Sequence, residues 1–237
     1  MAVEAVIFDW GGTLTRWHDV DFHAESLALA QAVVHRDDAA EHPVPADLGA
    51  RLHQAGNAIW GRSRDHQQSA TIADLFTEAG LDHDPDLLDA YFDFWVPHTA
   101  TDPEVRPLFE ALRASGIRVG VLSNTIWPRE WHRGFFERDG VLDLIDGDVY
   151  TSEIPWTKPS PHAFAAAMEA VGATDPGACV YVGDRLFDDV WGAQQAGMRA
   201  IHIPLSNIPR EQVGHTEGEP DAVVRRLAEI ADVVAAW

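Results

Sequence analysis

Short apolar runs alternate with longer amphipathic stretches over most of the chain. The apolar runs predict buried strands at residues 3–8, 117–124, within 141–152, at 178–184 and at 198–204. The amphipathic stretches predict helices from Asp102-Pro103 to Gly116, from Ser160-Pro161 to Gly172, over 188–197 and over about 219–235. Strands that alternate with helices indicate βαβ units, so we expect an α/β fold with a doubly wound parallel sheet.

One long stretch departs from this alternation. Between residues 16 and 98 only helical patterns occur, at 24–36, 46–60, 71–80 and 85–95. Asp84 is the expected N-cap of the last of these helices, and Pro85 stands at its first helical position. We therefore expect a core domain formed by residues 1–15 and 99–237, with a helical subdomain inserted at residues 16–98.

The length and composition of the chain are typical of a soluble globular protein. The 237 residues, with 46% hydrophobic content, suffice for one α/β core with a small second domain. No apolar run approaches the roughly 20 residues of a membrane helix, and the segment MAVEAVIFDW is typical of a first strand, not of a signal peptide. Cys179 is the only cysteine, so we expect no intrachain disulfide and a cytoplasmic location. A monomer is the default expectation, with a dimer as the alternative.

The charge balance narrows the choice of partners. The formal net charge of −21 repels nucleic acid and anionic membranes, so neither is an expected partner. The same charge repels a phosphorylated substrate, so a site for such a substrate must be locally positive. All but one of the 17 Lys and Arg residues are arginine, which makes Lys158 a candidate for a position that needs an ammonium group.

Polar residues follow the predicted strands at the points where the strands end. Asp9, the pair Ser123-Asn124 and Asp184 each close a strand, and Lys158 lies on the loop before a helix. Ligands of open parallel sheets bind beyond the carboxyl ends of the strands. Two carboxylates, a hydroxyl and an ammonium group suit phosphoryl transfer: one Asp attacks, the second shares a Mg²⁺ ion with it, and the other groups hold the phosphoryl oxygens.

In this order the residues resemble the four motifs of the haloacid dehalogenase (HAD) superfamily. The matching segments are Asp9-Trp10-Gly11-Gly12-Thr13-Leu14, Val121-Leu122-Ser123-Asn124, Lys158-Pro159-Ser160-Pro161, and Val182-Gly183-Asp184 with Asp188-Asp189 after it. The resemblance spans nearly the whole predicted core. It implies a Rossmann-like HAD core, a hydrolase activity on a small phosphorylated substrate, and a C1-type cap at residues 16–98.

The resemblance also implies roles for individual residues. Asp9 would be the nucleophile that becomes phosphorylated, with Ser123 bound to the phosphoryl group and Lys158 neutralising charge between them. Asn124 and Gly12 would complete the substrate-binding set. The Mg²⁺ ligands would be Asp9, the carbonyl of Gly11, Asp184 and, directly or through water, Asp189 or Asp188.

The chain departs from the superfamily pattern at Gly11. Phosphatases of the superfamily usually carry an Asp there, which protonates the leaving group and then activates water. Loss of a general acid/base typically lowers the rate by roughly 10²–10⁴-fold. The nearest replacements are His18, Asp19, Asp21 and His23. A substrate with a good leaving group would need the acid less.

Three functions remain open, of which a specialised phosphatase is favoured. A non-phosphatase hydrolase such as a dehalogenase is disfavoured by Gly11 and by the intact Gly183-Asp184. A phosphonatase needs a lysine in the cap, whereas Lys158 lies outside residues 16–98. The third interpretation is a catalytically degenerate protein that binds a phosphorylated ligand or a protein partner, and the joint presence of Asp9, Ser123, Lys158 and Asp184 argues against it.

Overall fold

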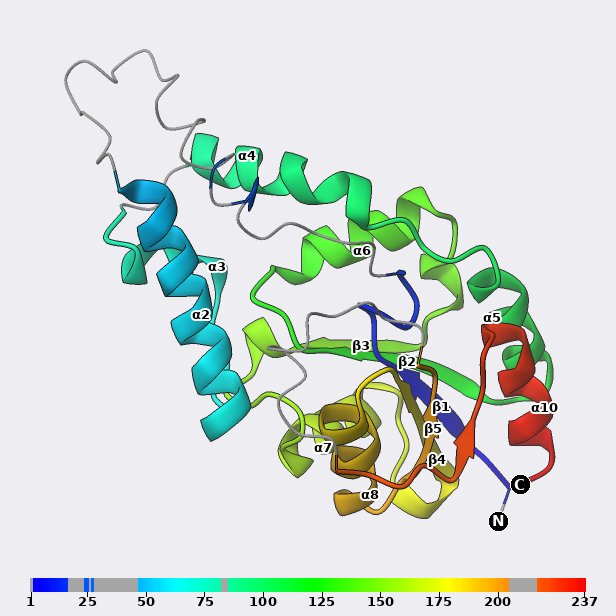
Figure 1. Ribbon diagram of the computed structural model, residues 1–237. Coiled ribbons are helices and arrows are strands. Elements are labelled where there is room, and N and C mark those ends of the chain that lie inside the picture. The colour runs from blue at the N-terminus through cyan, green and yellow to red at the C-terminus, as the bar shows by residue number, and fades with distance from the viewer. Residues whose placement is uncertain (1, 17–23, 26, 28–46, 82–84, 205–216) are drawn as a thin grey trace.

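A parallel sheet forms the centre of the molecule (Figure 1). The computed structural model describes residues 2–16, 24–25, 27, 47–81, 85–204 and 217–237. The strands are β1 (Ala5–Phe8), β2 (Arg118–Ser123), β3 (Gly147–Tyr150), β4 (Cys179–Gly183), β5 (Arg199–His202) and β6 (Ala222–Val223). Their order is β3-β2-β1-β4-β5-β6, and each neighbouring pair is parallel. The predicted α/β class with a doubly wound sheet is confirmed.

Strand β1 is central and is buried on both of its faces. Its alternate side chains point to opposite sides of the sheet: Val6 and Phe8 belong to one hydrophobic core, and Ala5 and Ile7 belong to the other. A strand buried on both faces needs a continuous apolar run, which the sequence supplies. The chain builds β2 and β3 on one side of β1 and then β4, β5 and β6 on the other. This reversal beside β1 marks the carboxyl end where a ligand site is expected.

Helices cover both faces of the sheet. The first core includes side chains of α5 (Val105–Ala114), α6 (Arg129–Arg138) and α10 (Ile230–Ala235). The second includes α7 (Pro161–Ala170) and α8 (Gly192–Gln195). Single 3₁₀ turns occur at Val96–His98, Leu142–Leu144, Thr151–Glu153, Pro176–Ala178 and Leu227–Glu229, and a π-helical segment occupies Leu186–Trp191.

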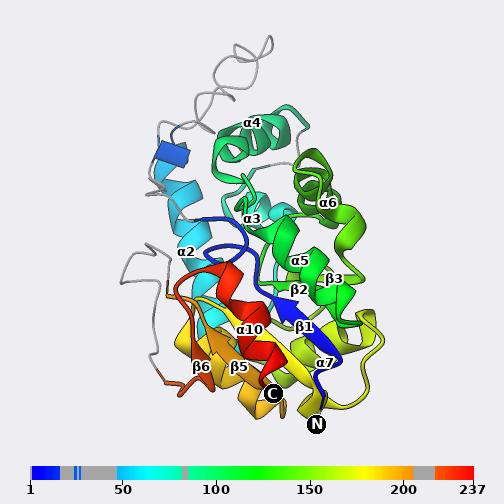
Figure 2. The same ribbon diagram turned by 90° about the vertical axis from the view of Figure 1, so that its right-hand side faces the viewer.

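The helices α2 (Leu48–His66), α3 (Ile72–Glu78) and α4 (Pro85–Trp95) lie apart from the sheet in Figure 1, and Figure 2 shows α4 at the end of the molecule opposite the two termini. A capping box begins α3, because the Thr71 side chain accepts from the Asp74 amide while the Asp74 carboxylate accepts from the Thr71 amide. Helix α4 runs along α6, where the Phe92 ring centroid lies 4.9 Å from that of Trp131 and 5.5 Å from that of Phe135. Within the described part of the chain, no helix combines the length and apolarity needed to cross a bilayer.

Some expected elements differ from the structure. The predicted helix over about 219–235 is wrong in its first part, since β6 precedes it and α10 begins only at Ile230. The edge of β5 accounts for this, because Asp221 and Val224 donate backbone hydrogen bonds to it. The sequence analysis did not predict α6. The segment at 188–197 begins earlier, as the π-helical turn, and then continues as α8. The predicted N-cap Asp84 and most of the predicted helix 24–36 lie outside the described residues.

Candidate active site

The carboxyl ends of three central strands bring the predicted polar residues together. Asp9 follows β1, and its amide donates to the carbonyl of Val182 on β4 at 2.8 Å. Ser123 is the last residue of β2, and Asp184 follows β4 directly. All three side chains are buried, with at most 8% exposed. The sheet therefore gathers at one edge the residues that the sequence placed at the strand ends.

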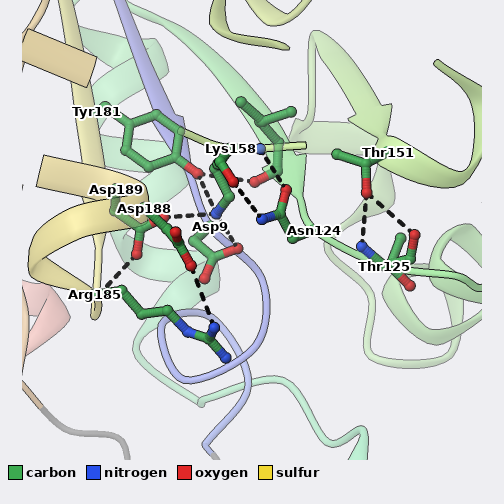
Figure 3. A network of polar contacts seen from close by, with 10 residues as sticks. Asp9, Asn124, Thr125, Thr151, Lys158, Tyr181, Arg185, Asp188 and Asp189 are labelled. Atoms are coloured by element: carbon green, nitrogen blue, oxygen red, sulfur yellow. Dashed lines mark hydrogen bonds and ion pairs between the residues drawn. The ribbon is translucent and has the colours of Figure 1, made fainter. Parts of the chain in front are cut away.

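The Lys158 side chain lies between Asp9, Asp189 and Tyr181 (Figure 3). Its ammonium nitrogen is 2.8 Å from Asp9 Oδ1 and 2.6 Å from Asp189 Oδ1, and it donates to the Tyr181 hydroxyl at 2.9 Å. Burial alone would lower the pKa of Lys158, but the two carboxylates outweigh it and raise the pKa above the usual value. The only lysine of the chain is thus a fixed positive charge between two aspartates.

The pKa of the Asp9 carboxyl is also raised, with burial as the largest cause. Asp189 adds to the rise, while Lys158 and Arg185 lower the pKa. A second cation therefore acts on Asp9 besides Lys158. Arg185 is partly exposed and pairs with Asp188 at 3.3 Å.

Asn124 holds the backbone of residues 155–158, here called the lysine loop, at Lys158. Its side-chain oxygen accepts from the Lys158 amide at 2.8 Å, and its side-chain nitrogen donates to the Lys158 carbonyl at 3.1 Å. The sequence analysis assigned Asn124 to substrate binding, and that role stays a prediction. In the structure both ends of its amide are occupied by the backbone of Lys158, so Asn124 fixes the position of that residue.

Asp189 is fully buried under the end of β4. Its Oδ2 accepts from the backbone amide of Arg185 at 2.8 Å, while Oδ1 contacts Lys158. Gly183 makes room for it: a Cβ on Gly183 would lie only 2.2 Å from Asp189 Cγ. The π-helical turn Leu186–Trp191, a form often found at functional sites, carries this residue.

Three carboxylates form a group that could hold a metal ion. Oxygens of Asp9, Asp184 and Asp189 all lie within 4.8 Å of one another, and Asp188 is not part of this set. An all-carboxylate donor set suits a hard divalent cation such as Mg²⁺. The cations Lys158 and Arg185 lie close enough to these carboxylates to interact with them electrostatically. The residues present fit the expected metal.

The loop after Asp9 is held by its own backbone. The Gly12 amide donates to the Thr15 carbonyl at 2.8 Å, and Gly12 has a φ of 84°, in the region that favours glycine. In this structure the Gly12 amide is therefore already paired, and its predicted contact with substrate stays untested. Gly11 is not among the residues with positive φ, so its backbone is compatible with a side chain.

Aromatic rings pack around Trp10, the residue that follows Asp9. The Trp10 ring meets His132 edge-on at 4.6 Å and Trp127 at 5.5 Å. His132 is completely buried and stacks on Tyr150 at 4.3 Å. Burial lowers the pKa of His132 from 6.5 to about 3, so its imidazole is neutral at physiological pH. Trp10, Trp127, His132 and Tyr150 thus form a buried cluster of aromatic rings.

The expected replacements for the missing acid, His18, Asp19, Asp21 and His23, lie outside the described residues. Among the residues that are described, the positioning roles of Asn124, Tyr181 and Gly183 were not foreseen. These three act through contacts between residues far apart in the chain, so local sequence patterns carry little signal for them.

The geometry agrees with comparisons to known proteins. A profile of haloacid dehalogenase-like hydrolases matches residues 3–197, so the chain belongs to this family of hydrolases. The glyceraldehyde 3-phosphate phosphatase of Methanopyrus kandleri is 30% identical over 164 residues, which make up 68% of this chain and 69% of that protein.

Solved structures show the same fold over the full length. The HAD phosphatase of Thermococcus onnurineus has a TM-score of 0.66 at 27% identity and covers 98% of both chains. A 2-haloacid dehalogenase of Pseudomonas syringae pv. Tomato DC3000 has a TM-score of 0.66 at 26% identity and covers 99% of both chains. Because one fold carries both activities, the residues of the site must decide between them.

Proposed function

We propose that this hydrolase is a Mg²⁺-dependent phosphatase that acts on a small phosphate monoester through an aspartyl-phosphate on Asp9. The observation that carries the proposal is the buried arrangement of Asp9, Lys158, Asp184 and Asp189 at one edge of the sheet. The M. kandleri relative, named as a glyceraldehyde 3-phosphate phosphatase, supports the substrate class.

The first step is the attack of a carboxylate oxygen of Asp9 on phosphorus, with departure of the leaving-group oxygen. Lys158, held between Asp9 and Asp189, neutralises the charge on the transferring oxygens, and Ser123 donates a hydrogen bond to them. In the second step, water attacks phosphorus and the bond between phosphorus and Asp9 breaks, which releases phosphate and restores the carboxylate.

Asp9, Asp184 and the carbonyl of Gly11 would hold Mg²⁺. Both oxygens of Asp189 already accept from Lys158 and Arg185, so its contact with the ion would run through water. When bound, the ion supplies positive charge for the phosphoryl oxygens. Asp189 is preferred over Asp188 because it belongs to the carboxylate group around Asp9.

The protein differs from the usual phosphatase pattern of the superfamily in how a proton would reach the leaving group. Gly11 offers no side chain to protonate a leaving group, so substrates with weakly basic leaving groups are preferred unless His18, Asp19, Asp21 or His23 supplies the proton. A dehalogenase is the less favoured function, since its chemistry would leave the group of carboxylates around Asp9 without use.

We propose residues 16–98 as a C1-type cap and residues 1–15 and 99–237 as the core. Helices α2, α3 and α4 stand apart from the sheet, which supports this division (Figure 1). Closure of the cap, with hinges near residues 15–20 and 97–102, would exclude water from the site. A cytoplasmic location and a monomeric state stay predictions from the sequence.

A panel of phosphate monoesters, with an activated aryl phosphate among them, tests the proposal. Each is assayed with Mg²⁺ and with chelator, beside the Asp9→Asn variant. Mg²⁺-dependent turnover that disappears in the variant is the expected result. Turnover no higher than that of the variant, even on the activated ester, would refute the phosphatase and favour a protein that only binds a phosphorylated ligand.

A further inference from the structure

The chain that leaves α2 pairs with the loop that precedes Lys158. Gln68 and Trp156 form an antiparallel β-bridge. The Thr157 amide donates to the Gln67 carbonyl at 3.1 Å, and the Ser69 amide donates to the Pro155 carbonyl at 3.2 Å. These backbone bonds join two segments that are far apart in the sequence.

The side chain of Thr157 adds a third bond to α2. It is buried, with 3% exposed, and its hydroxyl donates to the carbonyl of Ser63 at 3.3 Å. Ser63 lies in the last turn of α2, where its carbonyl also accepts from the Gln67 amide at 2.9 Å. The end of the helix and the lysine loop therefore share one acceptor.

Gln67 is the C-terminal cap of α2, and its amide donates to the Ser63 carbonyl in the last turn of the helix. Its φ of 53° lies in the left-handed region, and Gln67 is the one non-glycine residue with positive φ in the described part of the chain. A residue with a Cβ adopts this conformation at a cost in free energy. It turns the chain from α2 into the bridge with residues 155–157.

Lys158 is thus held from two sides. On one side, Asn124 binds its backbone amide and carbonyl. On the other side, the preceding residue, Thr157, is tied to α2 by its amide and its hydroxyl. The adjacent Cα atoms are only about 3.8 Å apart, so a displacement of Thr157 is passed to Lys158.

We propose that the C-terminal end of α2 positions the Lys158 ammonium, with Thr157 as the positioning residue. This inference rests on the proposed function, in which Lys158 stabilises the transferring phosphoryl group. Helix α2 belongs to the segment proposed as the cap, so the position of the cap controls the geometry of a catalytic cation as well as access to the site. An error of about 1 Å in such a group costs on the order of 10²-fold in rate.

Two pairs of variants test the coupling, one on each side of the bridge. Thr157→Val removes the hydroxyl, and Thr157→Ser keeps it as the matched control. Ser69→Pro removes the amide that bonds Pro155, and Ser69→Ala keeps that amide. We expect Thr157→Val and Ser69→Pro to weaken the binding of inorganic phosphate with Mg²⁺ by roughly 3- to 10-fold and to lower kcat similarly, as the loss of one hydrogen bond allows. The two controls should stay within about 2-fold of the wild type.

A double-mutant cycle separates positioning from a general structural effect. In a Lys158→Met background, Thr157→Val should cause no further loss of phosphate affinity, because the group through which it acts is gone. Losses that multiply in the double variant would mean that Thr157 does not act through Lys158 and would overturn the proposal.

Hydrogen exchange gives a readout that needs neither turnover nor phosphate binding. The Lys158 amide, bonded to Asn124, should exchange faster in Thr157→Val and Ser69→Pro than in their controls. Equal exchange in all four variants would overturn the proposal. Exchange is measured without substrate, so it tests the positioning of Lys158 independently of activity. If the wild type had no phosphatase activity, the proposed function would be refuted, but the exchange rates would still test whether Thr157 and Ser69 hold Lys158.

Discussion

Replacement of Gly183 by alanine probes the packing on which the site depends. A Cβ at this position would lie 2.2 Å from Cγ and 2.3 Å from Oδ2 of Asp189, far inside van der Waals contact. Asp189 cannot turn aside freely, because it is fully buried and its oxygens bind Lys158 at 2.6 Å and the Arg185 amide at 2.8 Å. The added methyl group must therefore displace a carboxylate that anchors the Lys158 ammonium.

The expected cost has two parts. Overpacking of a buried position costs about 1–3 kcal/mol, and separating Asp189 from Lys158 adds a share of the roughly 3–5 kcal/mol that breaking a buried ion pair costs. We expect the free energy of unfolding of Gly183→Ala to fall by about 2–5 kcal/mol in total. Turnover by the fraction that remains folded should fall as well, since the Lys158 ammonium loses one of its two carboxylate partners.

Urea unfolding measures the change, with Gly134→Ala as the matched control. Gly134 lies in α6, and a Cβ there would meet nothing within 4 Å. The same substitution should stabilise this helix by about 0.5–1 kcal/mol. A Gly183→Ala protein within about 0.5 kcal/mol of wild type, with unchanged kcat, would show that Asp189 is not held as described.

Three further predictions concern protons and metal. Burial lowers the pKa of His132 to about 3 in the folded protein, whereas the unfolded chain binds a proton at this histidine below about pH 6.5. The stability that the neutral, buried His132 contributes is therefore present above pH 6.5 and is lost as the pH falls toward 3. His132→Gln should therefore reduce the slope of unfolding free energy against pH over that interval by up to about 1.4 kcal/mol per pH unit; a slope equal to that of the wild type would contradict this prediction. Gly11→Asp should raise turnover of alkyl phosphates by up to roughly 10²–10⁴-fold, whereas Gly11→Asn, which adds no acid, should turn them over at the wild-type rate. Equal rates for the two variants would show that a carboxyl at position 11 does not supply the missing general acid. Asp184→Asn should weaken Mg²⁺ binding in calorimetry by more than the roughly 10–100-fold typical of outer-shell partners, whereas the exposed Asp232→Asn should bind as wild type does.

Much of the candidate site follows from the ends of the strands. A strand buried on both faces shows itself as an apolar run, and parallel strands end at one edge, so the sequence alone groups Asp9, Ser123 and Asp184. Lys158 stands out because it is the only lysine. The structure brings Lys158, Asp9 and Asp184 together as expected.

Other features depend on contacts that no local pattern encodes. Asn124 and Lys158 are 34 residues apart, and Tyr181 of β4 contacts the Lys158 side chain from 23 residues away. Helix α6 was missed because its aromatic face packs on α4, a partner that the sequence alone does not identify. At residues 219–229, hydrogen bonds to the edge of β5 outweigh a modest helical propensity. In each case tertiary contacts decide the local structure.

The most direct test of the proposed chemistry is to trap the phosphorylated enzyme. An activated aryl phosphate is mixed with the wild type and Mg²⁺, quenched in acid within the first turnover, and the peptides are analysed by mass spectrometry. The account predicts a phosphoryl group on the peptide that contains Asp9, and its loss in Asp9→Asn or with chelator. Substrate turnover with no phosphoryl group on that peptide, or undiminished turnover by Asp9→Asn, would contradict it.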